Sequence, residues 1–345
     1  MEYIAIGLLF LMFSTVEIIK YNKAYSYFII LIVCIIMILF AGLRDGSSVG
    51  TDSHAYFFNY KFPYDYNVEF GYKYLSILFS KVIEANYNVF LIFLNALSIY
   101  LISNSLKRNS YFLVFPLLIY FSDFYLYYNF SGIRQAMALS FSCCAIYHAY
   151  NRNYKYFFLL ILCASLFHIS ALVFSLAVII PNVKMTIKNY VYLIFITVIG
   201  FFLVSYIIEN NEYLSVKFKY YSEIQENSDN IVTQYIIGLL KRAIVLSLAL
   251  IYRKQLFLNN RFIYLFNLYL LGVVIYASTY LISPDFGVRF STYYTVVDML
   301  LVGNMLYLCK NTSSKVIIFV IIALMVLYKI NSYAILDTYI YKLAF

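Results

Sequence analysis

Long apolar segments separated by short polar turns dominate this chain. Apolar runs of about 20 residues suit helices that cross a bilayer, whereas the strands of a membrane barrel alternate over about ten residues. The pattern therefore predicts an all-α, polytopic integral membrane protein with about eleven transmembrane segments. We place these segments at 3–20, 26–43, 88–106, 110–125, 131–150, 155–180, 188–208, 233–252, 261–282, 290–309 and 314–334. No small-residue cleavage site follows the first segment, so we expect it to be retained.

Residues 155–180 are long for one upright helix, and His168 lies at their middle. If this segment crossed the membrane once, Lys184 and Lys188 would lie outside, against the rule that basic turns face the cytoplasm. Two interpretations stay open. The segment forms either a re-entrant hairpin of two half-helices, whose polar break near His168 lines a cavity, or one long tilted helix.

Basic turns orient the other segments. Lys and Arg residues gather in alternate turns, which are expected to face the cytoplasm: Lys20, Lys23, Lys107, Arg108, Arg152, Lys155, Arg253, Lys254, Arg261, Lys310 and Lys315. Residues 44–87, 123–131, the acidic loop 209–232 and 283–289 then face outward. Within the first outer loop, residues 69–85 are too charged to cross, and their apolar spacing predicts a helix lying in the interface. The chain 1–345 is predicted to be a single transmembrane domain.

Composition supports this class of protein. The chain has 345 residues, of which 64% are hydrophobic and only 12% charged. A soluble domain carries about a quarter charged residues, so a large globular core is excluded. The net charge of +9 is spread over short loops and does not indicate nucleic-acid binding. All five cysteines fall within apolar runs without Cys-x-x-Cys spacing, so neither disulfides nor a zinc site is expected.

Three isolated arginines, Arg44, Arg134 and Arg289, lie at the ends of apolar segments on the predicted outer side. A guanidinium at the bilayer centre costs roughly 2.5–3.5 kcal/mol on insertion scales, so it usually has a partner or a ligand. The guanidinium fork matches phosphate oxygens two at a time. Three such residues on one side therefore indicate a site for an anionic, phosphate-bearing ligand.

Short polar motifs surround these arginines. Residues 44–54 contain two glycines that permit close backbone approach, and Thr51 and Asp52 can cap a following helical turn. On spacing alone, an ordinary polar loop that leaves a membrane helix, with the Arg44 side chain snorkelling, is the simpler explanation of this stretch. Arg134 and Gln135 open an apolar helix, whose N-terminal amides and dipole attract anions. An anchoring role fits Arg134 poorly, because anchoring cations usually face the cytoplasm.

His168 stands in the apolar stretch 164–172. A lone histidine in a membrane helix is usually a hydrogen-bonded bundle residue, but it can also accept a proton, because its reference pKa lies near neutrality. Both interpretations stay open. Residues 285–294 place another outer-loop arginine, Arg289, at the start of a helix that also contains Tyr293.

Five of these motifs, taken in order, resemble the EpsG/Wzy-type polysaccharide polymerases, which make O-antigen, capsule or exopolysaccharide. The motifs are R-D-G-S-S-V-G-T-D at 44–52, E-F-G-Y at 69–72, S-G-I-R-Q-A-M-A at 131–138, F-H-I-S-A-L at 167–172 and R-F-S-T-Y-Y at 289–294. The resemblance covers about residues 40–300. It implies polymerisation of repeat units carried on undecaprenyl diphosphate, on the outer side of the bacterial cytoplasmic membrane, facing the periplasm or the cell exterior.

In the implied reaction, a hydroxyl of one lipid-linked oligosaccharide attacks the anomeric carbon of another, and undecaprenyl diphosphate leaves. The leaving group needs positive charge and the attacking hydroxyl needs a base. No carboxylate cluster suited to Mg²⁺ is evident, so we expect no metal and no cofactor. We expect His168, or failing that Asp52, to be the base. The predicted substrate-binding residues are Arg44, Thr51, Arg134, Gln135, Arg289 and Tyr293.

The expected partners are undecaprenyl-diphosphate-linked oligosaccharide, as donor and acceptor, and membrane lipid. A flippase and a chain-length regulator are further candidates, and no nucleic acid is expected. Two other functions use the same chemistry. A transporter or flippase of lipid-linked oligosaccharide would favour charges through a central cavity or an internal repeat, and neither is evident here. A related oligosaccharide ligase would differ in its acceptor, which the residues do not reveal.

Overall fold

A computed structural model describes residues 1–181, 231–281 and 283–344, and nine further positions from 183 to 206. Within that part of the chain the regular structure is helical, with one isolated β-bridge between Arg44 and Leu343. The predicted all-α membrane class is therefore confirmed. Most of the predicted segment 188–208 and of the acidic loop 209–232 lies outside the described residues.

The chain divides into two compact units. Unit 1 comprises residues 1–178 and 298–345, and unit 2 comprises residues 179–297. Unit 1 contains α1 (Glu2–Ile19), α2 (Lys23–Gly42), α3 (Ser53–Lys61), α4 (Phe70–Ile77), η1 (Leu78–Val82), α5 (Tyr87–Asn109), α6 (Val114–Tyr120), η2 (Phe121–Tyr125), α7 (Leu126–Tyr128), α8 (Ile133–Tyr150), α9 (Tyr154–Ser165), most of η3 (Ile169–Ile179), α16 (Asp298–Leu308), α17 (Thr312–Ala334) and η4 (Asp337–Tyr339). Unit 2 contains α12 (Ile231–Ile251), α13 (Arg253–Leu256), α14 (Asn260–Thr279) and α15 (Pro284–Thr295).

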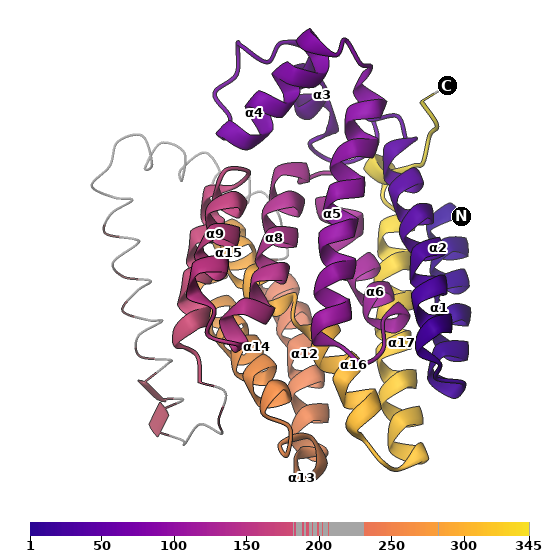
Figure 1. Cartoon of the computed structure of the whole chain (residues 1–345), viewed down its shortest axis with the longest axis vertical. Helices are drawn as coiled ribbons and strands as arrows, with labels where there is room; N and C mark the ends of the chain where they lie inside the picture. The colour runs from indigo at the N-terminus through magenta and orange to yellow at the C-terminus, as the bar shows by residue number, and fades with distance from the viewer. Residues whose placement is uncertain are drawn as a thin grey trace. The chain divides into compact units, whose positions relative to one another are not determined.

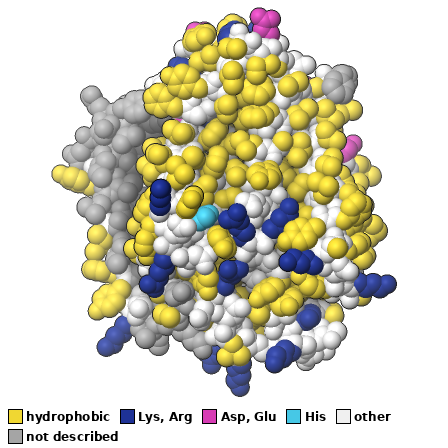
Figure 2. All heavy atoms as spheres, viewed as in Figure 1, with side chains coloured by type: hydrophobic (Ala, Val, Ile, Leu, Met, Phe, Trp, Pro, Cys, Tyr) yellow, Lys and Arg dark blue, Asp and Glu magenta, His cyan; other side chains and the backbone are white. Residues whose placement is uncertain are grey.

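Six helices of the described chain are long and apolar enough to cross a membrane, namely α1, α2, α5, α12, α14 and α17. The apolar helices α9 and η3 are shorter. The count of eleven segments therefore stays a prediction. Figure 2 shows hydrophobic side chains covering much of the face that it draws, as expected for a surface in contact with lipid.

The predicted segment at 290–309 is not one continuous helix. One helix, α15, ends at Thr295, and the next, α16, begins at Asp298. The residues at the break are Thr295, Val296 and Val297, whose branched side chains are stiff and lower helix propensity. The acidic side chain of Asp298 then stands in the first turn of α16, where it suits the helix dipole.

The long apolar segment 155–180 folds back on itself. Helix α9 ends at Ser165 and η3 begins at Ile169. The ring of Phe157, near the start of α9, lies 6.3 Å from the ring of Phe174 in η3. In a continuous α-helix these residues would be about 25 Å apart, at 1.5 Å per residue. The interpretation as one tilted helix is therefore wrong, and the chain forms a hairpin that reverses near His168.

The segment predicted as the first outer loop forms α3, α4 and η1. Figure 1 shows α3 and α4 beside the upper end of α5. Their inner face packs through aromatic rings, since Tyr72 lies 5.6 Å from Tyr56 and 5.7 Å from Phe90. On the other face, Phe70 and Tyr74 are 67% and 64% exposed. This apolar outer face agrees with the predicted interfacial helix, while its depth relative to the membrane stays a prediction.

Basic residues gather at the start of α2 and at the end of α5, away from α3 and α4. Lys23 at the start of α2 and Lys107 near the end of α5 both lie over the ring of Tyr27, at 5.9 and 5.4 Å from its centre. Arg108 lies 5.1 Å from the ring centre of Tyr147 in α8. This cluster agrees with a cytoplasmic position for that end of unit 1.

Candidate functional site

Arg44, the first residue of the first motif, also contacts Phe130, directly before the third motif, inside unit 1. Its side chain is fully buried, and it donates hydrogen bonds to the carbonyl oxygens of Ala41, Val49 (3.3 Å) and Phe130 (2.9 Å). Its guanidinium also lies 4.6 Å from the ring centre of Phe130. Ala41 belongs to the last turn of α2, where carbonyls lack helical partners and a cation is favourable. Backbone carbonyls thus account for the buried charge of Arg44, and its predicted contact with substrate stays a prediction.

Gly50 allows the two motif-bearing loops to touch. It has a φ of 113°, a conformation that residues with a Cβ rarely adopt, and a Cβ there would lie 2.6 Å from the carbonyl oxygen of Phe130. The next residue, Thr51, donates its backbone N–H to the hydroxyl of Ser131, at 2.8 Å. The close approach therefore places Thr51 and Asp52 beside the loop that leads into α8.

The C-terminal residues hold the same loop from the other side. Gly50 donates to the carbonyl of Thr338 at 2.8 Å, and Asp45 donates to that of Lys342 at 2.7 Å. The hydroxyl of Tyr339 lies 2.8 Å from that of Ser131. The sequence reasoning missed this contribution, because residues 336–344 carry no motif that would link them to a loop almost 300 positions earlier.

Arg134 stands at the centre of the site, in the first turn of α8. Its Nη1 forms an ion pair with the carboxylate of Glu69, which immediately precedes α4. Its Nε donates to the hydroxyl of Tyr56 in α3 at 3.4 Å, and the guanidinium lies 5.6 Å from that ring centre. The side chains of Arg134 and Glu69 remain 26% and 23% exposed, so a ligand can reach the pair.

The start of α8 offers further donors for an anion. Gly132 occupies the N-cap position, and no side-chain hydrogen bond caps the first turn. Backbone N–H groups at such a terminus, with the helix dipole, attract negative charge. Gln135 is only 6% exposed, and its Nε2 has no hydrogen-bond partner among the described residues. Such a donor is costly unless a ligand or a water molecule satisfies it.

Tyr56 and Asp52 complete this side of the site. Burial raises the pKa of the Tyr56 hydroxyl, and the positive charge of Arg134 offsets only part of that effect. The phenol therefore stays protonated at neutral pH. Because its oxygen accepts a hydrogen bond from Arg134, its own O–H can donate to a ligand. Asp52 is the exposed N-cap residue of α3 and lies close enough for its charge to act on Tyr56.

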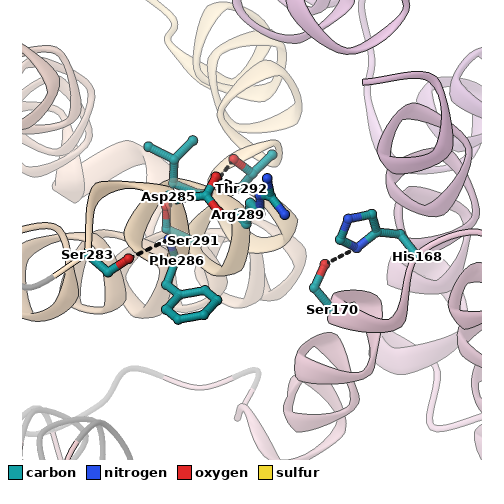
Figure 3. Close-up of polar contacts among 9 residues, drawn as sticks. His168, Ser170, Ser283, Asp285, Phe286, Arg289, Ser291 and Thr292 are labelled. Atoms are coloured by element: carbon teal, nitrogen blue, oxygen red, sulfur yellow. Dashed lines mark hydrogen bonds and ion pairs between the residues drawn. The ribbon is translucent and has the colours of Figure 1, made fainter. Parts of the chain in front are cut away.

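The hairpin that carries His168 docks on the start of α4. Gly71 donates its backbone N–H to the carbonyl of Leu166 at 2.7 Å, and this contact joins the E-F-G-Y motif to the turn before His168. The Nδ1 of His168 lies 2.6 Å from the hydroxyl of Ser170, as Figure 3 shows. His168 is half-buried. Four of the five sequence motifs are thus tied together within unit 1.

Gly71→Ala should strongly reduce activity without unfolding the protein. A Cβ at this position would lie 2.8 Å from the carbonyl oxygen of Leu166, so the hairpin or α4 must shift. A displacement of about 1 Å at a catalytic site can cost on the order of 10²-fold in rate. The measurement is polymer formed per molecule of folded protein.

Gly7→Ala is the matched control for this prediction. Its Cβ would lie 2.6 Å from Cδ1 of Ile330, the far end of a flexible side chain, so little rearrangement is needed. Normal activity of Gly71→Ala would show that the contact between α4 and the hairpin is not required.

The fifth motif belongs to unit 2. Arg289 forms an ion pair with Asp285 one helical turn earlier, with 2.7 Å between Nε and Oδ1. Figure 3 draws this part of α15, where Ser283 caps the helix through the N–H of Phe286 at 3.5 Å. Tyr293 is fully buried. The substrate contacts predicted for Arg289 and Tyr293 stay predictions.

Glu69 and Tyr56 are the site residues that sequence reasoning missed. Glu69 is the first residue of the E-F-G-Y motif, and it lies directly before α4. A carboxylate at the start of the predicted interfacial helix was the sequence signal that could have identified it. Within the part of the chain that the structure describes, no group of three His, Cys, Asp or Glu side chains gathers as metal ligands would. The reaction without a metal or cofactor stays a prediction.

Comparison with known proteins identifies one relationship. The sequence pattern of the EpsG family matches residues 27–344, nearly the whole chain. No curated protein and no solved structure matches this chain.

Proposed function

Because this chain belongs to the EpsG family, we propose that it joins oligosaccharide repeat units carried on undecaprenyl diphosphate into a surface polysaccharide. The family indicates a function like that of a polysaccharide polymerase, acting on lipid-linked saccharides in a membrane. The lipid diphosphate, its contacts and the outward-facing site are our proposal. We place the reaction on the outer side of the bacterial cytoplasmic membrane.

The proposed reaction is a glycosyl transfer. A hydroxyl oxygen of the acceptor forms a bond to the anomeric carbon of the donor, the bond from that carbon to the diphosphate oxygen breaks, and the electron pair leaves with the diphosphate. Arg134, the first-turn amides of α8 and Gln135 would stabilise the charge on the leaving group. His168 is the first candidate to take the hydroxyl proton, and Asp52 is the second.

One observation supports this assignment most directly. Arg134 is a partly exposed cation at a helix N-terminus that no side chain caps, and a buried amide donor adjoins it in sequence. Each of these features attracts an anion, and together they suit a diphosphate without a metal ion. Arg44 and Thr51 would hold the loop 44–52 beside the start of α8. Arg289 and Tyr293, in unit 2, are further proposed substrate contacts.

The test uses purified protein in lipid vesicles with an undecaprenyl-diphosphate-linked repeat unit. We expect lipid-linked chains of two or more units, with one undecaprenyl diphosphate released per bond formed and no effect of a metal chelator. Movement of the lipid-linked substrate across the bilayer without chain growth would instead identify a flippase. Transfer only to a different acceptor would identify a ligase.

A further inference from the structure

The carboxylate of Glu69 occupies the position on Arg134 where the proposed function requires a diphosphate. The carboxylate pairs with Nη1, while Nε of the same guanidinium donates a hydrogen bond to the hydroxyl of Tyr56. About three quarters of each side chain in the ion pair is buried, so water screens the pair less than one at the surface. An incoming diphosphate would share this guanidinium with a second anion.

The side chain of Glu69 can leave Arg134 without unfolding its own helix. Glu69 occupies the N-cap position of α4, but its side chain caps no backbone N–H of that helix. The backbone two residues later is held independently, because Gly71 donates to Leu166. A rotation of the Glu69 side chain would therefore break the ion pair while α4 and the hairpin stay in contact.

We propose that Glu69 is a resident counter-ion that the substrate diphosphate displaces from Arg134 and that returns to expel the diphosphate product. This inference rests on the proposed function. Each bond formed leaves undecaprenyl diphosphate in the site, and a cation that holds the leaving group in the transition state also slows its departure. A carboxylate that competes for Arg134 weakens the product complex and so permits another cycle.

The test compares wild-type protein with Glu69→Gln, which keeps the volume of the side chain and removes its charge. Binding of undecaprenyl diphosphate and of inorganic pyrophosphate to the purified proteins is measured by calorimetry. We expect Glu69→Gln to bind about tenfold more tightly, because a nearby like charge has been removed. In the polymerisation assay, both KM and kcat should fall, because product release becomes slow.

Glu84→Gln is the matched control. Glu84 is exposed and precedes α5 in the same loop, and the partners of Arg134 in the described chain are Glu69 and Tyr56, so loss of the Glu84 charge should leave diphosphate affinity within about twofold. If Glu69→Gln does not fold, as judged by size-exclusion chromatography, Glu69→Asp replaces it in the binding measurements. It keeps the charge on a shorter side chain, and an intermediate gain in affinity is expected.

The outcomes separate the two proposals. Equal or weaker binding by Glu69→Gln, with the wild-type protein binding diphosphate, would overturn the counter-ion role and leave the proposed function standing. It would mean that Glu69 positions Arg134. If neither protein binds undecaprenyl diphosphate or pyrophosphate, the diphosphate site at Arg134 falls, and the counter-ion role falls with it.

Discussion

Arg134→Ala and Arg134→Lys are both expected to stop chain growth at single repeat units. The guanidinium donates through Nε to Tyr56 and through Nη1 to Glu69, and its two Nη groups can hold a diphosphate in a planar fork when Glu69 is displaced. Lysine keeps the positive charge but loses this geometry. Removing one donor to a developing oxyanion typically costs about 10²–10³ in rate, so the loss of a fork should be at least that large.

The readout is the length distribution of lipid-linked polysaccharide in cells that carry each variant in place of the native gene. The amount of protein in the membrane should stay near normal, because Arg134 is partly exposed. Arg152→Lys is the matched control, since Arg152 is an exposed arginine in the turn after α8. Long chains from well-expressed Arg134→Ala would show that this arginine only anchors its helix.

Arg134 could be singled out from the sequence, but its partner could not. An arginine at the start of an apolar helix on the predicted outer side is conspicuous in any hydropathy pattern. Glu69 lies 65 positions earlier in the chain. The two meet because α3 and α4 pack against each other and against α5 through Tyr56, Tyr72 and Phe90. Periodicity predicts such a helix and its apolar face, but it does not show which end of it meets which neighbour.

The segments 155–180 and 290–309 show which local signals are reliable. Near His168, polar residues within an apolar run and a conflict in the charge rule together indicated a break, and the structure has a hairpin there. At 290–309, hydropathy alone predicts one helix, whereas the β-branched run before Asp298 favours the break that the structure has. A break in a membrane segment is therefore best predicted where topology and local propensity are considered together.

Arg44 shows a limit of reasoning from charge. A buried cation does not by itself indicate an anionic ligand, because backbone carbonyls at a helix C-terminus and in loops are acceptors too. A hydropathy value cannot reveal such acceptors, because it depends on the type of side chain and not on whether the backbone carbonyl has a hydrogen-bond partner. The carbonyls that Arg44 uses, from Ala41, Val49 and Phe130, come from three separate parts of unit 1. Its role is therefore best decided by comparing stability with activity.

Arg44→Met should lower the yield and the unfolding temperature of the protein much more than any change at Arg134. Methionine fills similar space but leaves three carbonyls in a buried region without their donor. Each unsatisfied group costs about 1–3 kcal/mol. The sum is comparable to the total stability of a typical domain, about 5–15 kcal/mol. The measurement is thermal unfolding in detergent, with Arg134→Ala as the comparison.

Arg44→Lys should fall between the wild type and Arg44→Met. Its ammonium can satisfy part of the carbonyl set but cannot reach as far as the guanidinium. Activity per folded molecule should then stay within a few-fold of the wild type, because the loop carrying Gly50 and Thr51 is also held by Thr338 and Ser131. A stable Arg44→Met protein that makes only single repeat units would contradict this account, and it would place Arg44 among the substrate contacts after all.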